Sequence, residues 1–312
     1  MTYASGGLIQ ASDYNGFVGN TAPSSAYTSS LAATDKVAAL IGVGYGDRGY
    51  GQTSTNLAVV TSGLAISAGQ WNNLINAMGT LNTHQGSGLT PPTTVATGQT
   101  IAYQSVIPSN IATLDTNRLN ANVTQMSVTN ALTSSVGVWN GVIRHIFTVD
   151  FGTENAARYF FNSGGQIRWS GANVGGTTGS AAAWAALLTN MGTIKMGATT
   201  TTYTGSGGTI TNNVGYYGLT GSLVQNFIHY GSGSPYSGIF YSIQVSRSNY
   251  VGANGGNGSL INCTVTFSDS SGGYGSVNGT TSSYIDQYKA GGVLTIATVS
   301  YTHLTLPTIY SV

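Results

Sequence analysis

Hydrophobic and polar residues alternate most clearly in the second half of the chain. From Tyr241 to Ser246, Tyr, Ile and Val take every other position, and Ser and Gln fill the positions between them. A period of two residues is typical of a strand with one buried face, so this run predicts an antiparallel strand over 238–247. Comparable runs predict further strands over 194–196, 216–219, 223–230, 260–267, 279–286 and 293–301.

The stretch 150–171 is the richest in aromatic, charged and turn-forming residues, and we expect the fold to be organised around it. Thr153 can cap a short helix whose first turn carries Glu154. Gly164 and Gly165 provide the left-handed exit that ends such a helix. The stretch therefore predicts a strand, a short helix, a glycine turn and a second strand.

The second of these strands has one apolar and one polar face. Ile167 and Trp169 alternate with Gln166, Arg168 and Ser170. The preceding strand, over 142–149, has apolar residues at both parities, which predicts a central strand covered on both faces. A later run over 179–191 is rich in Ala and Leu and predicts a helix that packs on the sheet.

The first 90 residues contain an internal repeat. The motif Ile9-x-Ala-x-x-Tyr-Asn-x-Phe-Val18 recurs as Ile66-x-Ala-x-x-Trp-Asn-x-Leu-Ile75. Each copy predicts a capped helix, the first with Ser12 before its aromatic turn and the second with a capping box of Ser67 and Gln70. The two apolar stripes either pack on each other or dock onto neighbouring subunits, and the sequence leaves both arrangements open.

Three regions and a tail follow from these patterns. We expect a helical attachment region over 1–90, a linker over 91–134 with one helix at 108–122, and an α+β domain over 135–299 with a mainly antiparallel sheet and two short helices. In the linker helix, Asp115 and Arg118 have the spacing of an ion pair. His84, at the end of the second repeat helix, is expected to stabilise the helix dipole.

Composition narrows the range of functions. Only 5% of the residues are charged, against a usual value of about 25%, while 45 glycines and many hydroxyl and amide side chains fill the difference. Such surfaces favour contacts between copies, because few charges must be desolvated. The net charge is +1 with scattered basic residues, so nucleic-acid binding is not expected. Neither a signal peptide nor a membrane span is expected.

The candidate chemistry is sparse. Asp150, Glu154, Arg158 and Arg168 form the densest titratable group, and its two carboxylates could serve a cell-wall hydrolase. The alternative is a structural network, with a Glu154–Arg158 pair, a stacked Arg168 and an extension through Arg144 and His145. We favour the alternative and expect no enzymatic activity, catalytic residue or cofactor.

Other potential sites have weaker patterns. The glycine-rich loop 42–51 lacks the spacing and the Lys-Ser/Thr ending of a phosphate loop. A metal site would require His84, His145 and His229 to meet. Cys263 is the only cysteine and is expected to be buried and inert. The tyrosines at 216–217, 230–236 and 241 could bind a glycan or a protein.

Three stretches carry a resemblance to a known group. These are Ala157-Arg-Tyr-Phe-Phe-Asn-Ser-Gly-Gly-Gln-Ile-Arg168, the opening stretch 3–15, and the region from 46–52 to the Trp71-Asn72 helix and His84. They resemble virion structural proteins of tailed marine phages, above all cyanophages. The resemblance implies a place in the virion and partners among other virion proteins and copies of this chain. It implies no particular chemistry.

Two sets of residues are expected to carry this structural role. The signature set is Glu154, Arg158, Tyr159, Phe160, Phe161, Asn162, Gly164, Gly165, Arg168 and Trp169, and the repeat-helix set is Tyr14, Asn15, Phe17, Trp71, Asn72 and Leu74.

The leading expectation is a non-enzymatic component of a phage tail, fibre or neck, and the alternative is an adhesin for a host receptor or glycan. The last residues, 300–312, resemble translated sequencing-adapter DNA and are expected to be a non-native tail.

Overall fold

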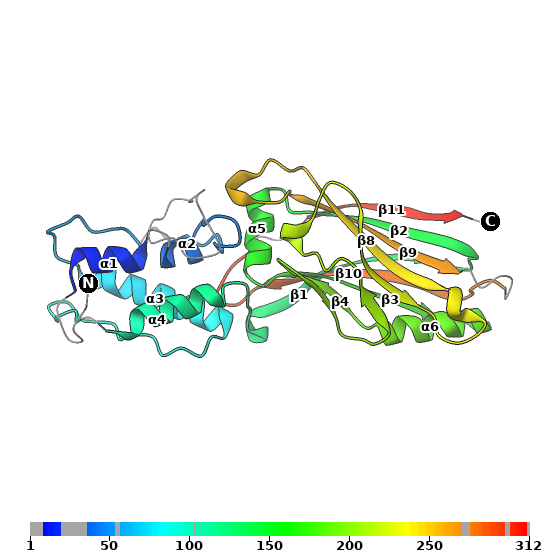
Figure 1. Cartoon of the computed structure of the whole chain (residues 1–312), viewed down its shortest axis with the longest axis horizontal. Helices are drawn as coiled ribbons and strands as arrows, with labels where there is room; N and C mark the ends of the chain where they lie inside the picture. The colour runs from blue at the N-terminus through cyan, green and yellow to red at the C-terminus, as the bar shows by residue number, and fades with distance from the viewer. Residues whose placement is uncertain are drawn as a thin grey trace.

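The computed structural model describes residues 9–19, 36–53, 57–102, 104–269, 275–296 and 300–310, with backbone alone at 129–131 and 300–310. Helices occupy the first part of the chain and strands dominate the rest (Figure 1). The first part contains α1 (Ala11–Val18), α2 (Val37–Ile41), α3 (Ala68–Gln85) and α4 (Val106–Thr116).

The long helix α3 forms the centre of the helical region. Ser67 and Gln70 form the predicted capping box, and Gly86 ends the helix in a left-handed conformation. Trp71, Leu74 and Leu81 are fully buried, since they face the neighbouring helices. The Tyr14 hydroxyl of α1 donates to the Gln70 carbonyl of α3 at 3.2 Å, so the two repeat helices pack on each other within one chain.

Two boundaries in this region differ from the prediction. The N-cap of α1 is Gln10 and not Ser12, because the Asp13 carboxylate accepts the Gln10 N–H at 2.9 Å and fixes the earlier start. Helix α4 ends at Thr116, well before 122, and the chain then turns towards the sheets.

The strands form two antiparallel sheets. The first has the order β1-β10-β3-β4-β5 and the second the order β11-β2-β9-β8-β7-β6. Their bounds are β1 (Met126–Val136), β2 (Gly141–Asp150), β3 (Gln166–Val174), β4 (Ile194–Met196), β5 (Thr201–Tyr203), β6 (Gly208–Ile210), β7 (Val224–Tyr230), β8 (Phe240–Ser248), β9 (Leu260–Asp269), β10 (Thr280–Ala290) and β11 (Ser300–Tyr310). With α5 (Glu154–Asn162) and α6 (Gly179–Met191), the chain has the predicted mainly β, α+β fold.

The two sheets stack face to face, and the core lies between them (Figure 1). His145 of β2 and Ser283 of β10 are hydrogen-bonded across the core at 2.8 Å. Helix α6 closes one end, where Trp184 meets Trp139 and Phe267 with ring centroids 5.4 and 5.5 Å away. Aromatic rings from both sheets and from α6 therefore fill the sandwich.

The strand β2 is buried on one face only. Ile143, His145, Phe147 and Val149 point into the core, whereas Arg144 is exposed and the remaining residues of that parity are partly exposed. The prediction of a strand covered on both faces was therefore wrong, because one face of β2 is turned to the other sheet and the opposite face points away from it. Apolar residues such as Ile146 lie on that outer side.

Other strand predictions also differ from the structure. Tyr216–Gly218 is a 3₁₀ turn and not a strand, and residues 293–296 are irregular, while 297–299 lie outside the described residues. The strands β1, β5 and β6 were not predicted, and the expected domain start near Ser134 falls inside β1. The backbone of β11 pairs with β2, with two register shifts, and the non-native origin of residues 300–312 stays a prediction.

Candidate functional site

The signature stretch forms the junction between the helical region and the sandwich. Helix α5 stands between the two parts, and the glycine-rich loop 42–51 and the loop 249–258 contact it (Figure 1). We call these three segments together the α5 joint. Thr153 caps α5 through the Ala156 N–H, and Gly164 leaves it in the left-handed region at φ 80°, as predicted.

Glu154 anchors the loop 249–258 to α5. Its carboxylate accepts the backbone N–H groups of Val251, Gly252, Ala253 and Gly258 at 2.6–3.1 Å. Burial would raise the pKa of Glu154, but these four hydrogen bonds outweigh it and hold the pKa below its ordinary value. Glu154 therefore stays ionised and does not pair with Arg158, so the predicted helical ion pair is absent from the described contacts.

The carbonyl oxygen of Gly46 is the focus of the joint. Arg158 donates to it from Nε at 3.2 Å and from Nη2 at 3.1 Å, and Asn162 donates from Nδ2 at 3.0 Å. The Tyr217 hydroxyl is a further donor at 2.5 Å. Three side chains from the sandwich domain therefore converge on one backbone atom of the glycine loop.

The glycine loop is held with its carbonyls facing inward. Arg158 also donates to the Arg48 carbonyl at 3.0 Å, and Asn162 donates to the Gly49 carbonyl at 3.1 Å. At Gly49, with φ 100°, an added Cβ would lie 2.4 Å from the Val43 carbonyl oxygen, so only glycine fits. A phosphate loop directs its backbone N–H groups at the bound anion. This loop instead directs its carbonyl oxygens at the side chains of α5.

Two ion pairs join side chains of the loop to Asp115 of α4 and to Arg118, which follows α4. Arg48 is fully buried and binds the Asp115 carboxylate through two hydrogen bonds of 2.6 and 2.7 Å. Arg118 binds Asp47 at 2.5 Å. The predicted Asp115–Arg118 pair is thus replaced, because Arg118 uses only the Asp115 backbone carbonyl and the Asp115 carboxylate turns to Arg48.

His84 provides another link across the junction. It is buried, and its Nε2 lies 2.9 Å from the Ser163 carbonyl oxygen at the end of α5. Burial lowers its pKa, and the contact with Ser163 only partly opposes this. His84 therefore serves as a neutral contact rather than as the predicted cationic partner of the helix dipole.

Aromatic and glycine residues pack around α5. Phe160 and Phe161 are buried around Phe151, and Phe161 stacks on Tyr216 with ring centroids 4.7 Å apart. The Tyr159 ring lies so close to Gly51 that a Cβ there would be 2.3 Å away. A Cβ on Gly165 would lie 2.3 Å from the Phe160 carbonyl oxygen. The last signature residue, Trp169, is buried on β3 in the sandwich core.

The repeat helices use their shared asparagine in the same way. Asn15 donates to the Val60 carbonyl at 2.8 Å and accepts the Val60 N–H at 2.7 Å. Asn72 makes the same pair of bonds to Val95, both at 2.9 Å. Each asparagine thus satisfies both backbone groups of one valine in an extended segment. Phe17 and Leu74, which match in the repeat, are both buried.

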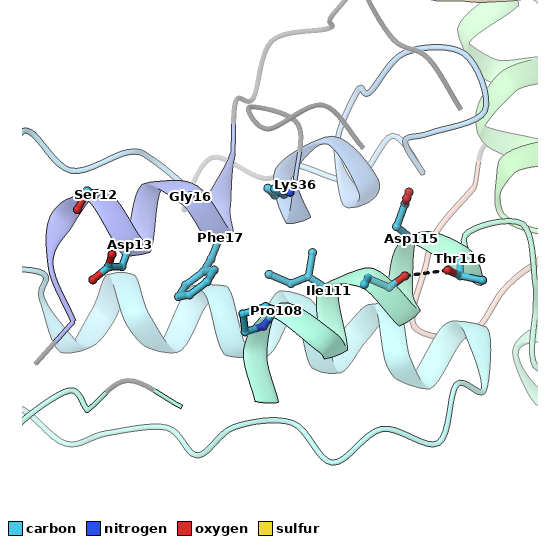
Figure 2. Close-up of a pocket in the computed structure, with 10 residues that line it drawn as sticks. Ser12, Asp13, Gly16, Phe17, Lys36, Pro108, Ile111, Asp115 and Thr116 are labelled. Carbon is cyan, nitrogen blue, oxygen red and sulfur yellow. Dashed lines mark hydrogen bonds between the residues drawn. The ribbon is translucent and has the colours of Figure 1, made fainter. Parts of the chain in front are cut away.

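A groove of about 450 Å³ opens between α1 and α4 (Figure 2). Phe17, Pro108 and Ile111 make its apolar part, and Asp13, Lys36 and Asp115 are its charged lining residues. Asp13 already accepts the Gln10 N–H, and Asp115 already binds Arg48. Both carboxylates therefore serve the fold.

The other candidate groups are not brought together. Asp150 accepts the Gly152 N–H at 2.7 Å, while Arg168 stacks over Tyr288 on the far side of the first sheet, and Arg144 and His145 point to opposite faces of β2. His84, His145 and His229 lie on α3, β2 and β7, and the described residues contain no metal-binding group of three or more His, Cys, Asp or Glu. Cys263 is buried, which raises the pKa of its thiol to about 12.

The tyrosine-rich loops do not form an exposed platform. Tyr216 and Tyr241 are buried, and the Tyr217 hydroxyl donates to the Gly46 carbonyl of the α5 joint. Tyr230 is the exposed member, at 55% of its surface. The role of Tyr217 was missed from the sequence, because its partner Gly46 lies 171 residues away and no local pattern marks the contact.

Comparison with known proteins finds no matching family model, no significantly similar curated protein and no significantly similar solved structure. Among the described helices, none combines the length and the apolar character that crossing a bilayer requires.

Proposed function

We propose that this chain is a non-enzymatic structural component of a tailed-phage virion, placed in the tail, fibre or neck. In this proposal the helical region attaches to other virion proteins or to copies of the chain, and the sandwich projects from it. The low charge and the stretches that resemble phage virion proteins support this role. The observation that carries it is the α5 joint.

The joint supports a mechanical role because its ionisable groups hold separate segments together through hydrogen bonds and an ion pair. Glu154 binds four backbone N–H groups, Arg158 binds three carbonyls of the glycine loop, and Arg48 binds Asp115. A catalytic group needs an accessible atom and a pKa suited to proton transfer. Groups held by several hydrogen bonds instead fix the position of one part of a protein relative to another.

Protein mass spectrometry of purified particles tests the proposal. Peptides of this chain should copurify with the capsid protein of a phage that encodes it, at a constant ratio across a density gradient. A soluble host protein measured in the same fractions is the control for contamination. Recovery of the chain only from the soluble lysate would refute the proposal.

The hydrolase alternative has lost its geometric support, since Asp150 and Glu154 each bind backbone N–H groups. A cell-wall digestion assay with the full chain and with Glu154→Gln is expected to show no activity in either. The tyrosine-rich loops no longer support the adhesin alternative. The outer face of the first sheet offers a different binding surface for it.

A further inference from the structure

Three charged residues lie side by side on the outer face of the five-stranded sheet. Asp286 of β10 is paired in register with Arg168 of β3, and Arg168 is paired with Lys195 of β4. We call these three residues the charged row. Neighbouring strands are about 4.8 Å apart, so the row crosses roughly 10 Å of sheet.

The row faces outward. On the same strands Ile167, Trp169, Ile194 and Ile285 are buried in the core, and residues of the other parity lie on the opposite face. Helix α6 packs on the inner side, since its Leu188 lies near Gly171, which is in register with the core residue Ser283. All three charged residues are partly exposed.

The charges of the row are not neutralised by close pairs. Among the described residues, salt bridges join Arg48 to Asp47 and Asp115, and Arg118 to Asp47, and none joins members of the row. Burial raises the pKa of Asp286, which Arg168 partly opposes, and burial together with Arg168 lowers the pKa of Lys195. In a chain with 5% charged residues, three charges in one line that form no salt bridge with any described residue are unlike the ion pairs around the joint.

The central member of the row is held in a fixed orientation. The Arg168 guanidinium lies 3.6 Å from the centre of the Tyr288 ring, and its Nε donates to Gln166 at 3.1 Å. Its two Nη atoms donate to no described residue. A stacked guanidinium with both Nη atoms available is prearranged for a carboxylate, which it can bind through two parallel hydrogen bonds.

The rest of the face suits a sugar. Tyr284 lies two residues from Asp286 on the same outer side and is partly exposed, which places an aromatic ring beside the row. Asp286 and Gln166 can accept hydrogen bonds from hydroxyl groups. A ligand that satisfies the whole face therefore carries carboxylates, hydroxyls and flat C–H surfaces on one rigid unit.

We propose that this outer face binds an acidic polysaccharide, with sugar carboxylates on Arg168 and Lys195 and sugar hydroxyls on Asp286. Two cations against one anion give the face a net positive charge that favours carboxylated over neutral sugars. Polymers whose polar groups are phosphates alone fit less well, because they offer no hydroxyl group to Asp286 and Gln166. The inference extends the proposed virion role, since a particle that displays many copies would gain avidity.

The test uses the full chain and a pair of matched probes. Oligogalacturonate carries one carboxylate per sugar, and its methyl ester has the same sugars without the charge. Isothermal titration calorimetry at about 50 mM salt should detect binding of the acidic probe and little binding of the ester. Raising the salt to about 200 mM should weaken the binding, because the charges are partly exposed.

Substitutions in the row should act with opposite signs. Lys195→Gln should weaken binding of the acidic probe roughly five- to tenfold. Asp286→Asn should strengthen it roughly two- to fivefold, because the amide oxygen can still accept a sugar hydroxyl while the repulsion of the sugar carboxylates is removed. Arg168→Gln should abolish it, with thermal melting to show that the variant folds. Arg144→Gln, an exposed substitution on the outer face of the other sheet, should leave the affinity unchanged.

Several outcomes would overturn the inference. These are no binding at millimolar probe, equal binding of the methyl ester, or weaker binding in Asp286→Asn. Self-association that Lys195→Gln disrupts in sedimentation experiments would instead assign the face to contacts between copies. Particle mass spectrometry is independent of these results, so the virion role and the glycan site can fail separately.

Discussion

The α5 joint and the charged row use the same few kinds of charged side chain in opposite ways. In the joint, Glu154 and Arg158 are buried and satisfied by backbone groups, so their charges stabilise one arrangement of the chain. In the row, Arg168, Lys195 and Asp286 are partly exposed and form no salt bridge among the described residues. The difference separates charges that hold the fold from charges that remain available to a partner.

The largest effect is expected at Arg158. Arg158→Met keeps much of the side-chain length but leaves the carbonyls of Gly46 and Arg48 without this donor. Because unsatisfied buried polar groups are destabilising, the free energy of unfolding should fall by about 3–5 kcal/mol in urea denaturation. Arg144→Met, on an exposed position, is the matched control and should change it by less than about 1 kcal/mol. Equal effects of the two substitutions would contradict a special role of the joint.

Acid should weaken the sandwich through His145. Burial lowers the pKa of His145 to about 4, below the value of about 6.5 that it has in the unfolded chain. The unfolded state therefore gains a proton first as the pH falls, so stability is intact above pH 6.5 and declines towards pH 4 by roughly 3 kcal/mol in total. Denaturation at stepped pH values measures this decline.

The matched variant is His145→Gln, which cannot take up the proton. Its stability should depend less on pH between 6.5 and 4 than that of the unmodified chain. His84 and His229 remain in the variant, and burial lowers the pKa of both, so part of the decline should persist. An unchanged pH dependence in the variant would remove His145 as a cause.

The repeat offers a smaller and internally controlled effect. Asn15→Ala and Asn72→Ala each remove two hydrogen bonds to one valine, and each should lower the unfolding free energy by about 1–2 kcal/mol. Asn76→Ala, on the exposed face of α3, should have a clearly smaller effect because its side chain makes no described hydrogen bond. If Asn72→Ala and Asn76→Ala were equivalent, the repeated asparagine would have no distinct structural role.

Features with a local signal could be predicted from the sequence. The capping box of Ser67 and Gln70, the bounds of α6 and the alternation of Ile167 and Trp169 with polar neighbours all depend on residues close in the chain. Residues 216–219 were predicted to form a strand because they are mostly apolar. They form a turn instead, and Tyr216 is buried because its ring stacks on Phe161 of the α5 joint.

Features that depend on distant partners could not be predicted. Arg48 and Asp115 are 67 residues apart, and the local spacing instead favoured Asp115 with Arg118. Glu154 had a helical neighbour of opposite charge at the correct spacing, yet its carboxylate is used by N–H groups about 100 residues further along. The charged row is likewise visible only once β10, β3 and β4 are placed side by side.

One pair of variants tests the central distinction most directly. Glu154→Gln and Asp286→Asn each remove one negative charge with little change in shape, one in the joint and one in the row. In parallel urea denaturation, Glu154→Gln should lower the unfolding free energy by about 2–3 kcal/mol, because an amide group would face backbone N–H donors, and Asp286→Asn should change it by less than about 0.5 kcal/mol. A loss of similar size in both variants, or no loss in Glu154→Gln, would contradict the separation of structural from available charges.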